Sequence, residues 1–155
     1  MDTLRSVAHL QRQIGDDRFQ ALISSDNTSK IKAFCDDLIR SSIPTELTIG
    51  GRTYEILGFL KEKERFIVGD TLVDRAEEMK ADLGKEDGQH FLKHQNDIPA
   101  KFRNHVTFVF TGWRHPKHSK HVAYLCWQDD RWILYWRWIW YGSDWNDNCR
   151  FPRRK

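Results

Sequence analysis

One tryptophan-rich segment, residues 121–141, constrains the fold of this chain more than any other feature. Five of the seven tryptophans lie inside it, and the other two, Trp113 and Trp145, lie just outside. Apolar and aromatic residues alternate with others on both sides of the polar run 128–131. Alternation of this kind is typical of β-strands, and a polar break between two such runs is typical of a hairpin. The segment therefore predicts two antiparallel strands joined by a turn.

A two-residue turn at Asp129 and Asp130 would set the register of this hairpin, because the turn fixes which residues lie opposite each other. On one side of the ribbon the opposed pairs are Trp127 with Trp132, Leu125 with Leu134, and Ala123 with Trp136. The other side carries Tyr124, Cys126, Ile133, Tyr135 and Arg137. Both sides are thus largely apolar. One must pack on helices, and the second is either covered too or exposed as an aromatic platform.

Helical spacing characterises the N-terminal part, residues 1–43. Apolar residues recur at intervals of three and four, loosely at first and clearly from Thr28 onward, until Pro44 ends the pattern. The clear stretch has one apolar face, made of Ile31, Phe34, Cys35, Leu38 and Ile39. Residues 46–60 then change to β-favouring runs around Gly50-Gly51. Two glycines between such runs predict a tight hairpin turn.

Two helices are predicted over residues 70–96. The first has an apolar face and ends at Gly84, a residue suited to the left-handed conformation of a helix C-cap. The second ends before Pro99, which cannot continue a helix.

Three strands are predicted over residues 105–141, followed by a polar and basic tail at residues 142–155. This order of elements lacks the strict alternation of a parallel α/β fold. It predicts one α+β domain over residues 1–155, with a mostly antiparallel sheet of about five strands and three to four helices packed on it. The tryptophan-rich hairpin is expected at the centre of that sheet.

Composition and the N-terminus exclude several classes of protein. With 155 residues, 39% hydrophobic and 30% charged, the chain has the composition of a soluble globular protein. No run approaches about 18 uncharged apolar residues, so no membrane span is expected. The N-terminus lacks the apolar block of a signal peptide, and three cysteines without a CxxC pair predict free thiols. A cytoplasmic protein is therefore expected.

Arginine interleaved with aromatic residues is the most specific functional pattern. Arg137 lies between Trp136 and Trp138, and the last six residues hold four cations and no acid. Because aromatic faces stack on bases and cations neutralise phosphates, the pattern predicts a small non-enzymatic binding or regulatory module for nucleic acid. The predicted binding residues are Arg131, Trp136, Arg137, Trp138, Trp140, Trp145, Arg150, Arg153, Arg154 and Lys155.

Two other functions are compatible with the sequence. The aromatic face of the hairpin would also serve a protein partner or a homodimer, with tryptophan and arginine as anchors. A small hydrolase is the second alternative, acting on carbohydrate through Asp144 and Asp147 beside Trp145, or using a metal. His90 and His94 are the weak metal candidates, because their spacing places both imidazoles on one helix face. No cofactor is expected.

Overall fold

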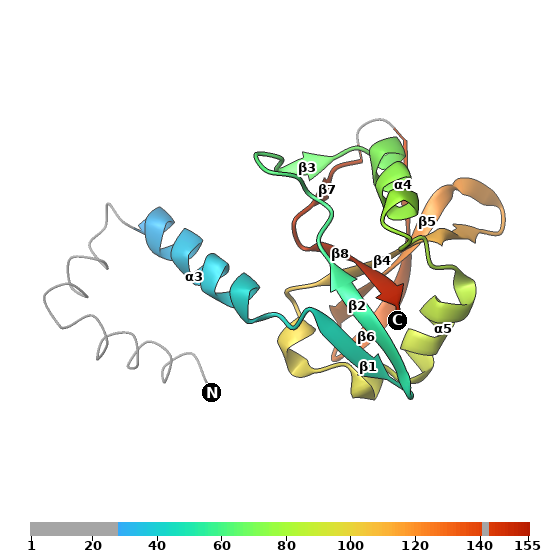
Figure 1. Ribbon diagram of the computed structural model, residues 1–155, viewed down its shortest axis with the longest axis horizontal. Helices are drawn as coiled ribbons and strands as arrows, with labels where there is room; N and C mark the ends of the chain where they lie inside the picture. The colour runs from blue at the N-terminus through green and yellow to red at the C-terminus, as the bar shows by residue number, and fades with distance from the viewer. Residues whose placement is uncertain (1–27, 141–142) are drawn as a thin grey trace, which may run out of the picture. The chain divides into compact units, whose positions relative to one another are not determined.

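The computed structural model describes residues 28–140 and 143–155 (Figure 1). By its internal contacts the chain divides into two compact units, residues 1–42 and 43–155, and each is described by itself. The expectation of one domain stays a prediction, because these units are defined by contacts and not by independent folding. The helical spacing predicted before residue 28 lies outside the described residues.

In the first unit the described element is helix α3, Thr28–Ser42. Its start and its end just before Pro44 agree with the sequence pattern. Phe34 and Leu38 on its apolar face are 47% and 49% exposed. Cys35 is half-buried.

A mixed six-stranded sheet forms the frame of the second unit, in the order β1-β2-β8-β4-β5-β6. Neighbouring strands are antiparallel except for β4 and β8, which run parallel. The strands are β1 (Glu46–Ile49), β2 (Arg52–Leu57), β4 (Thr107–His115), β5 (His118–Gln128), β6 (Arg131–Trp138) and β8 (Cys149–Arg154). Strands β3 (Phe66–Ile67) and β7 (Trp145–Asn146) pair as a separate two-stranded ribbon.

The two faces of this sheet carry different cores. Helix α5 (Lys85–Lys93) and the short 3-10 helices η2 (Gln95–Asp97) and η3 (Ala100–Phe102) cover one face, where Phe91, Phe102 and Phe108 pack together. Helix α4 (Gly69–Glu78) and the β3–β7 ribbon cover the other. Alternate residues of each strand enter the two cores, as the period of a strand requires. The α+β class is confirmed, with three α-helices in the described part of the chain.

The predicted place of the tryptophan-rich hairpin is wrong. Strands β5 and β6 form that hairpin, and β6 is the outermost strand of the sheet as described. Its internal register is correct: Asp129 and Asp130 form the turn at φ of 50° and 57°, and Trp127 lies opposite Trp132. The turn chemistry specifies the pairing within a hairpin, whereas its place in the sheet depends on strands far away in the sequence.

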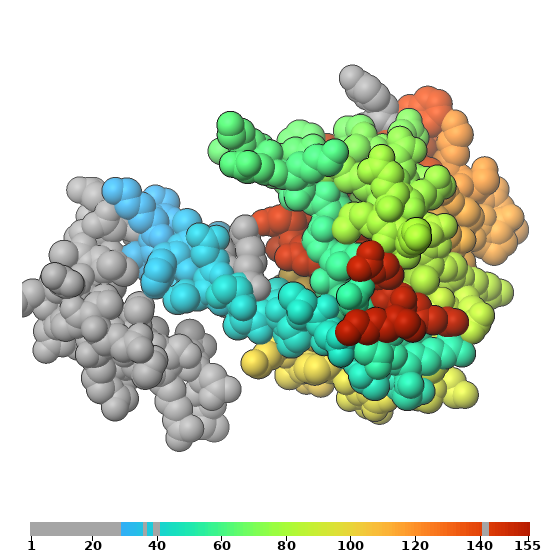
Figure 2. All heavy atoms as spheres, in the orientation of Figure 1, coloured from blue at the N-terminus to red at the C-terminus, as the bar shows by residue number. Residues whose placement is uncertain are grey.

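The centre of the sheet belongs instead to β8, where the sequence predicts a polar and basic tail. Cys149 and Phe151 alternate into the core beneath α4, and this alternation was obscured by the arginines and the proline between and after them. Pro152 is tolerated because β8 pairs with β4 only at Cys149 and Arg150 and beyond them only with β2. Figure 2 shows the C-terminal residues packed between the β1–β2 hairpin and α5.

The polar run after Trp113 forms a third tight hairpin, beside those at Gly50-Gly51 and Asp129-Asp130. Strand β4 continues to His115 and β5 begins at His118, so that only Pro116 and Lys117 form the turn. The helix that the sequence predicts to end at Gly84 is also shorter than expected, because α4 ends at Glu78. Gly84 is the N-cap of α5 rather than the C-cap of α4.

All three cysteines are free thiols, as predicted. Burial raises the pKa of Cys149 to about 11, so this thiol is protonated and unreactive near neutral pH. No helix in the described ranges is both long and apolar enough to cross a membrane.

The Gly50-Gly51 turn gives a test of the fold. Gly50 has φ of +51°, and a Cβ there would lie 2.7 Å from the His94 ring and 2.8 Å from that of His90. Gly51 has φ of +79° but nothing within 4 Å of such a Cβ. We expect Gly50→Ala to lower the free energy of unfolding by about 2–4 kcal/mol and Gly51→Ala by about 1 kcal/mol, in urea titrations. Equal losses would contradict the contact between this turn and α5.

Candidate functional site

The C-terminal cations predicted to bind a polyanion are paired with carboxylates of the same unit. Arg153 donates to Glu55 Oε2 from Nε at 2.7 Å, and Lys155 forms an ion pair with Glu46. Arg150 donates to the carbonyl oxygen of Cys149 at 2.9 Å. Strands β4 and β5 also separate β8 from β6, so these cations do not join the hairpin aromatics as the sequence suggests.

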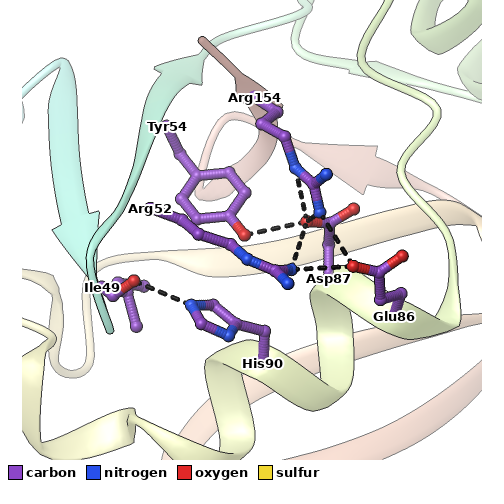
Figure 3. Close-up of polar contacts among 7 residues, drawn as sticks. All are labelled: Ile49, Arg52, Tyr54, Glu86, Asp87, His90 and Arg154. Carbon is purple, nitrogen blue, oxygen red and sulfur yellow. Dashed lines mark hydrogen bonds and ion pairs between the residues drawn. The ribbon is translucent and has the colours of Figure 1, made fainter.

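Asp87 is the centre of the densest polar cluster, shown in Figure 3. Asp87 is buried, with 6% of the residue exposed, and its Oδ1 accepts hydrogen bonds from Tyr54 Oη at 2.8 Å and Arg154 Nη2 at 2.6 Å. Arg52 Nη1 lies 3.7 Å from the same oxygen and 3.0 Å from Glu86 Oε1. Burial, followed by the hydrogen bond to Asp87, raises the pKa of Tyr54 to about 12.

This cluster balances two guanidinium groups against two carboxylates, so it has no excess charge with which to attract a ligand. It joins three elements that are remote in sequence, namely β2, α5 and β8. The hydrogen bond to Asp87 and its charge also raise the pKa of Arg154, which keeps the guanidinium charged. We therefore interpret it as a clamp that holds the last strand in the sheet.

The two weak metal candidates pack against the β1–β2 turn. His90 Nε2 lies 2.8 Å from the carbonyl oxygen of Ile49, and because a carbonyl only accepts, this nitrogen carries the hydrogen. The His94 ring lies 4.6 Å from that of His90, centroid to centroid. Within the described residues no group of three or more side chains is arranged to hold a metal ion.

Several of the predicted aromatic binding residues are buried or held in place. Trp145 is 1% exposed and belongs to the core beneath α4. Arg137 has its guanidinium 4.9 Å from the centroid of the Trp145 ring and donates to the carbonyl oxygen of Asp144 at 2.9 Å. Trp136 is half-buried, with the edge-to-face contact to Trp113 at 5.5 Å between ring centroids. Arg131 is exposed beside the β5–β6 turn.

Trp138 and Trp140 are the two tryptophans that face solvent, at 50% and 53% exposure. The Trp138 ring lies 5.0 Å from the ring of His121, its neighbour across the strands. Lys120 places Nζ 3.7 Å from the centroid of the Trp140 ring, a cation–π contact. Trp140 therefore presents aromatic surface next to a cation, and Trp138 presents it next to an imidazole.

Three histidines lie at the same end of the sheet. His115 and His118 flank the β4–β5 turn with stacked rings 5.0 Å apart, and His121 lies 5.3 Å from His118 and 6.1 Å from His115. His115 also meets Trp136 edge to face at 4.9 Å. We call this region the hairpin-end surface. Its residues are His115, Lys117, His118, Lys120, His121, Trp136, Trp138 and Trp140.

The hairpin-end surface is formed by two stretches of sequence that lack acids, residues 98–128 and 131–143, which are separated by Asp129 and Asp130. Residues 98–128 contain five Lys or Arg and four His. Partial burial, followed by the positive charges of His118, His121 and Lys117, lowers the pKa of His115. The charged neighbours that shift its pKa are thus all cationic.

The sequence predicted Trp136, Trp138 and Trp140 of this surface as binding residues but not its lysines and histidines. The lack of Asp and Glu in residues 98–128 could have indicated a basic surface here. Only the two-residue turn, however, brings the imidazoles of β4 and β5 together.

Comparison with known proteins gives no family to which the chain can be assigned. No family model matches it, and no curated protein or solved structure matches it at a significant level. The function is therefore argued from the geometry of the hairpin-end surface.

The clamp predicts that replacing Asp87 destabilises the protein more than replacing the adjacent Glu86. Asp87→Asn leaves Arg154 and Arg52 without their buried anion, and we expect a loss of about 2–4 kcal/mol in the free energy of unfolding, allowing for the solvent that reaches Arg154. Glu86, whose side chain is 73% exposed, is the matched control. Its replacement by Gln should cost less than about 1 kcal/mol. Similar losses in urea titrations of the two variants would contradict the clamp.

Proposed function

We propose that this protein binds single-stranded nucleic acid through the hairpin-end surface. The observation that carries the proposal is the pair of half-exposed tryptophans, Trp138 and Trp140, in contact with His121 and Lys120 at an end of the sheet without acidic sequence. Exposed tryptophan is costly in water, so its retention beside cations favours a binding role.

Stacking would supply the part of the affinity that is independent of base sequence. Every base has a π face, and an aromatic side chain that stacks on one contributes about 1–3 kcal/mol. The bases must be unpaired for this contact, which favours a single strand over a duplex. Trp136 would act beneath the surface, because it is held edge to face by Trp113 and His115.

Electrostatic attraction would supply the rest of the binding affinity. Lys117 and Lys120 are exposed and lie in the acid-free segment 98–128, and Lys120 contacts the Trp140 ring. A strand bound here would release counterions from its phosphates, so its affinity would fall steeply as salt increases. The C-terminal cations contribute less in this proposal, because Arg153, Arg154 and Lys155 have carboxylate partners within the fold.

The matched control for the stacking test is Phe66, which is 51% exposed but lies on β3, in the separate ribbon. We expect Trp138→Ala and Trp140→Ala each to weaken binding of a labelled oligothymidylate about tenfold. Phe66→Ala should leave the affinity unchanged. The measurement is fluorescence anisotropy at low ionic strength. Absence of binding by the parent protein, or an equal loss in the Phe66 variant, would remove the basis of the proposal.

A homodimer is the second candidate function, favoured by the open edge of β6. The backbone N–H of Trp132 donates to Gln95 Oε1 at 2.9 Å, and that of Ile139 donates to the Lys120 carbonyl at 2.8 Å. Since hydrogen bonds alternate along an antiparallel pair, Leu134, Trp136 and Trp138 direct their backbone groups away from β5. Exposed edges of this kind accept another strand.

The charges along β6 are compatible with a second copy at this edge. With β6 antiparallel to itself about Trp136, Leu134 would lie opposite Trp138, and Tyr135 opposite Arg137. No two like charges would face each other, and the exposed Trp138 would be covered. Dimer formation in this register and nucleic-acid binding would both use Trp138. Experiment can therefore separate the two functions.

Light scattering over a range of protein concentrations tests the dimer. If β6 pairs with itself, the parent protein should have twice the monomer mass, and Trp138→Lys should restore the monomer, because a lysine at the edge disfavours strand addition. A monomer at about 100 µM, where an interface of micromolar affinity would be formed, would exclude this second candidate.

A further inference from the structure

We propose that His115, His118 and His121 form a phosphate-binding subsite of the hairpin-end surface, which operates when the imidazoles are protonated. The inference rests on the proposed function and adds its regulation: the single strand would be held more tightly at mildly acidic pH. Histidine is the side chain whose ordinary titration lies in that range.

The first support is the convergence of the three rings. Their centroids are separated by 5.0, 5.3 and 6.1 Å, close enough for one phosphate to contact more than one imidazole. They come from two strands and the ends of a two-residue turn, so the sheet fixes their positions. His121 Nδ1 is buried and has no hydrogen-bond partner among the described residues.

The second support is the sign of the charges around the cluster, because the charged groups that shift the pKa of His115 are all basic side chains. On β4 the neighbouring charge is Arg114, which faces the opposite side of the sheet and is influenced by Glu77 of α4. The turn contributes Lys117 and β5 contributes Lys120. Strand β6 contributes the neutral rings of Trp136 and Trp138, and its Arg137 is directed to Trp145 on the other face.

These charges set the direction of the pH effect. Burial, followed by the positive charges of its neighbours, lowers the pKa of His115, so protonation of this ring is opposed in the free protein. A bound phosphate would supply the missing negative charge and raise the pKa of each imidazole that it contacts. By linkage, affinity then increases as pH falls through about 6.5 and below, and decreases as the imidazoles lose their protons.

The aromatic neighbours are compatible with charged imidazoles. His115 meets Trp136 at 4.9 Å and His121 lies 5.0 Å from Trp138. A protonated ring gains from a tryptophan face through the cation–π interaction. Trp138 would therefore contact both a stacked base and the imidazole next to the phosphate, which links the two parts of the site.

A metal ion is a poorer occupant than phosphate. The rings of His115 and His118 are nearly parallel, at 28°, so they stack rather than direct their nitrogens to a shared point. In the neutral ring His115 Nδ1 accepts the backbone N–H of Lys117 at 3.1 Å, so this nitrogen is not available to a metal, and protonation of the ring gives up this hydrogen bond. This agrees with the lack of a metal-binding group among the described residues.

The test compares oligothymidylate binding at about pH 5.5 and about pH 7.5, at constant ionic strength. The parent protein should bind about tenfold more tightly at the lower pH. The variant with His115, His118 and His121 all replaced by Gln should lose this dependence. His105→Gln is the matched control, because His105 is exposed and lies in the same acid-free segment outside the cluster; it should retain the dependence.

Failures of the two proposals are distinguishable. Binding by the parent protein that requires Trp138 but is independent of pH would overturn the phosphate subsite and leave the proposed function standing. No binding at either pH would overturn the proposed function and, with it, the subsite. Retention of the pH dependence in the triple variant would also contradict the subsite.

A second measurement avoids reliance on the triple variant. Nuclear magnetic resonance titration of the parent protein would follow each imidazole with and without inorganic phosphate, and then with oligothymidylate. We expect the pKa of at least two of the three imidazoles to increase on binding, while that of His105 stays constant. Unchanged values with saturating oligothymidylate would overturn the subsite.

Discussion

The rest of the second unit depends on one buried carboxylate, that of Asp87. A buried charge is tolerated only when partners surround it, and here the partners come from β2 and β8, on either side of α5 in the sequence. The clamp thereby holds the end of β8 against the helix and beside β2. With β8 in place, Cys149 and Phe151 complete the core beneath α4, and β2 is joined to β4 across one continuous sheet.

The C-terminal arginines stabilise the fold, so they are poor candidates for a binding surface. Arg153 and Arg154 have carboxylate partners and serve the fold. The cations near exposed aromatic surface are instead on the β4–β5 turn and on β5, where the sequence has no acids to pair with them. The proposed site is therefore at the end of the outer hairpin rather than at the terminus of the chain.

Local chemistry made part of this fold predictable. Gly50-Gly51 and Asp129-Asp130 specify their turns because both positions of each adopt positive φ. The place of β8 was not predictable in this way, because Arg154 and Arg153 find their partners 67 and 98 residues away. When those partners are not known, a run of arginines is predicted to be exposed to solvent. The same limit applied to the histidines, whose cluster exists only after β4 and β5 pair.

The most direct test of the central claim is to follow the seven indole N–H resonances while single-stranded oligothymidylate is added at low ionic strength. The account predicts that Trp138 and Trp140 shift most, that Trp136 shifts less, and that the buried Trp132 and Trp145 stay unchanged. Equal shifts of all the indoles, or shifts confined to residues near β8, would contradict a binding site at the hairpin-end surface.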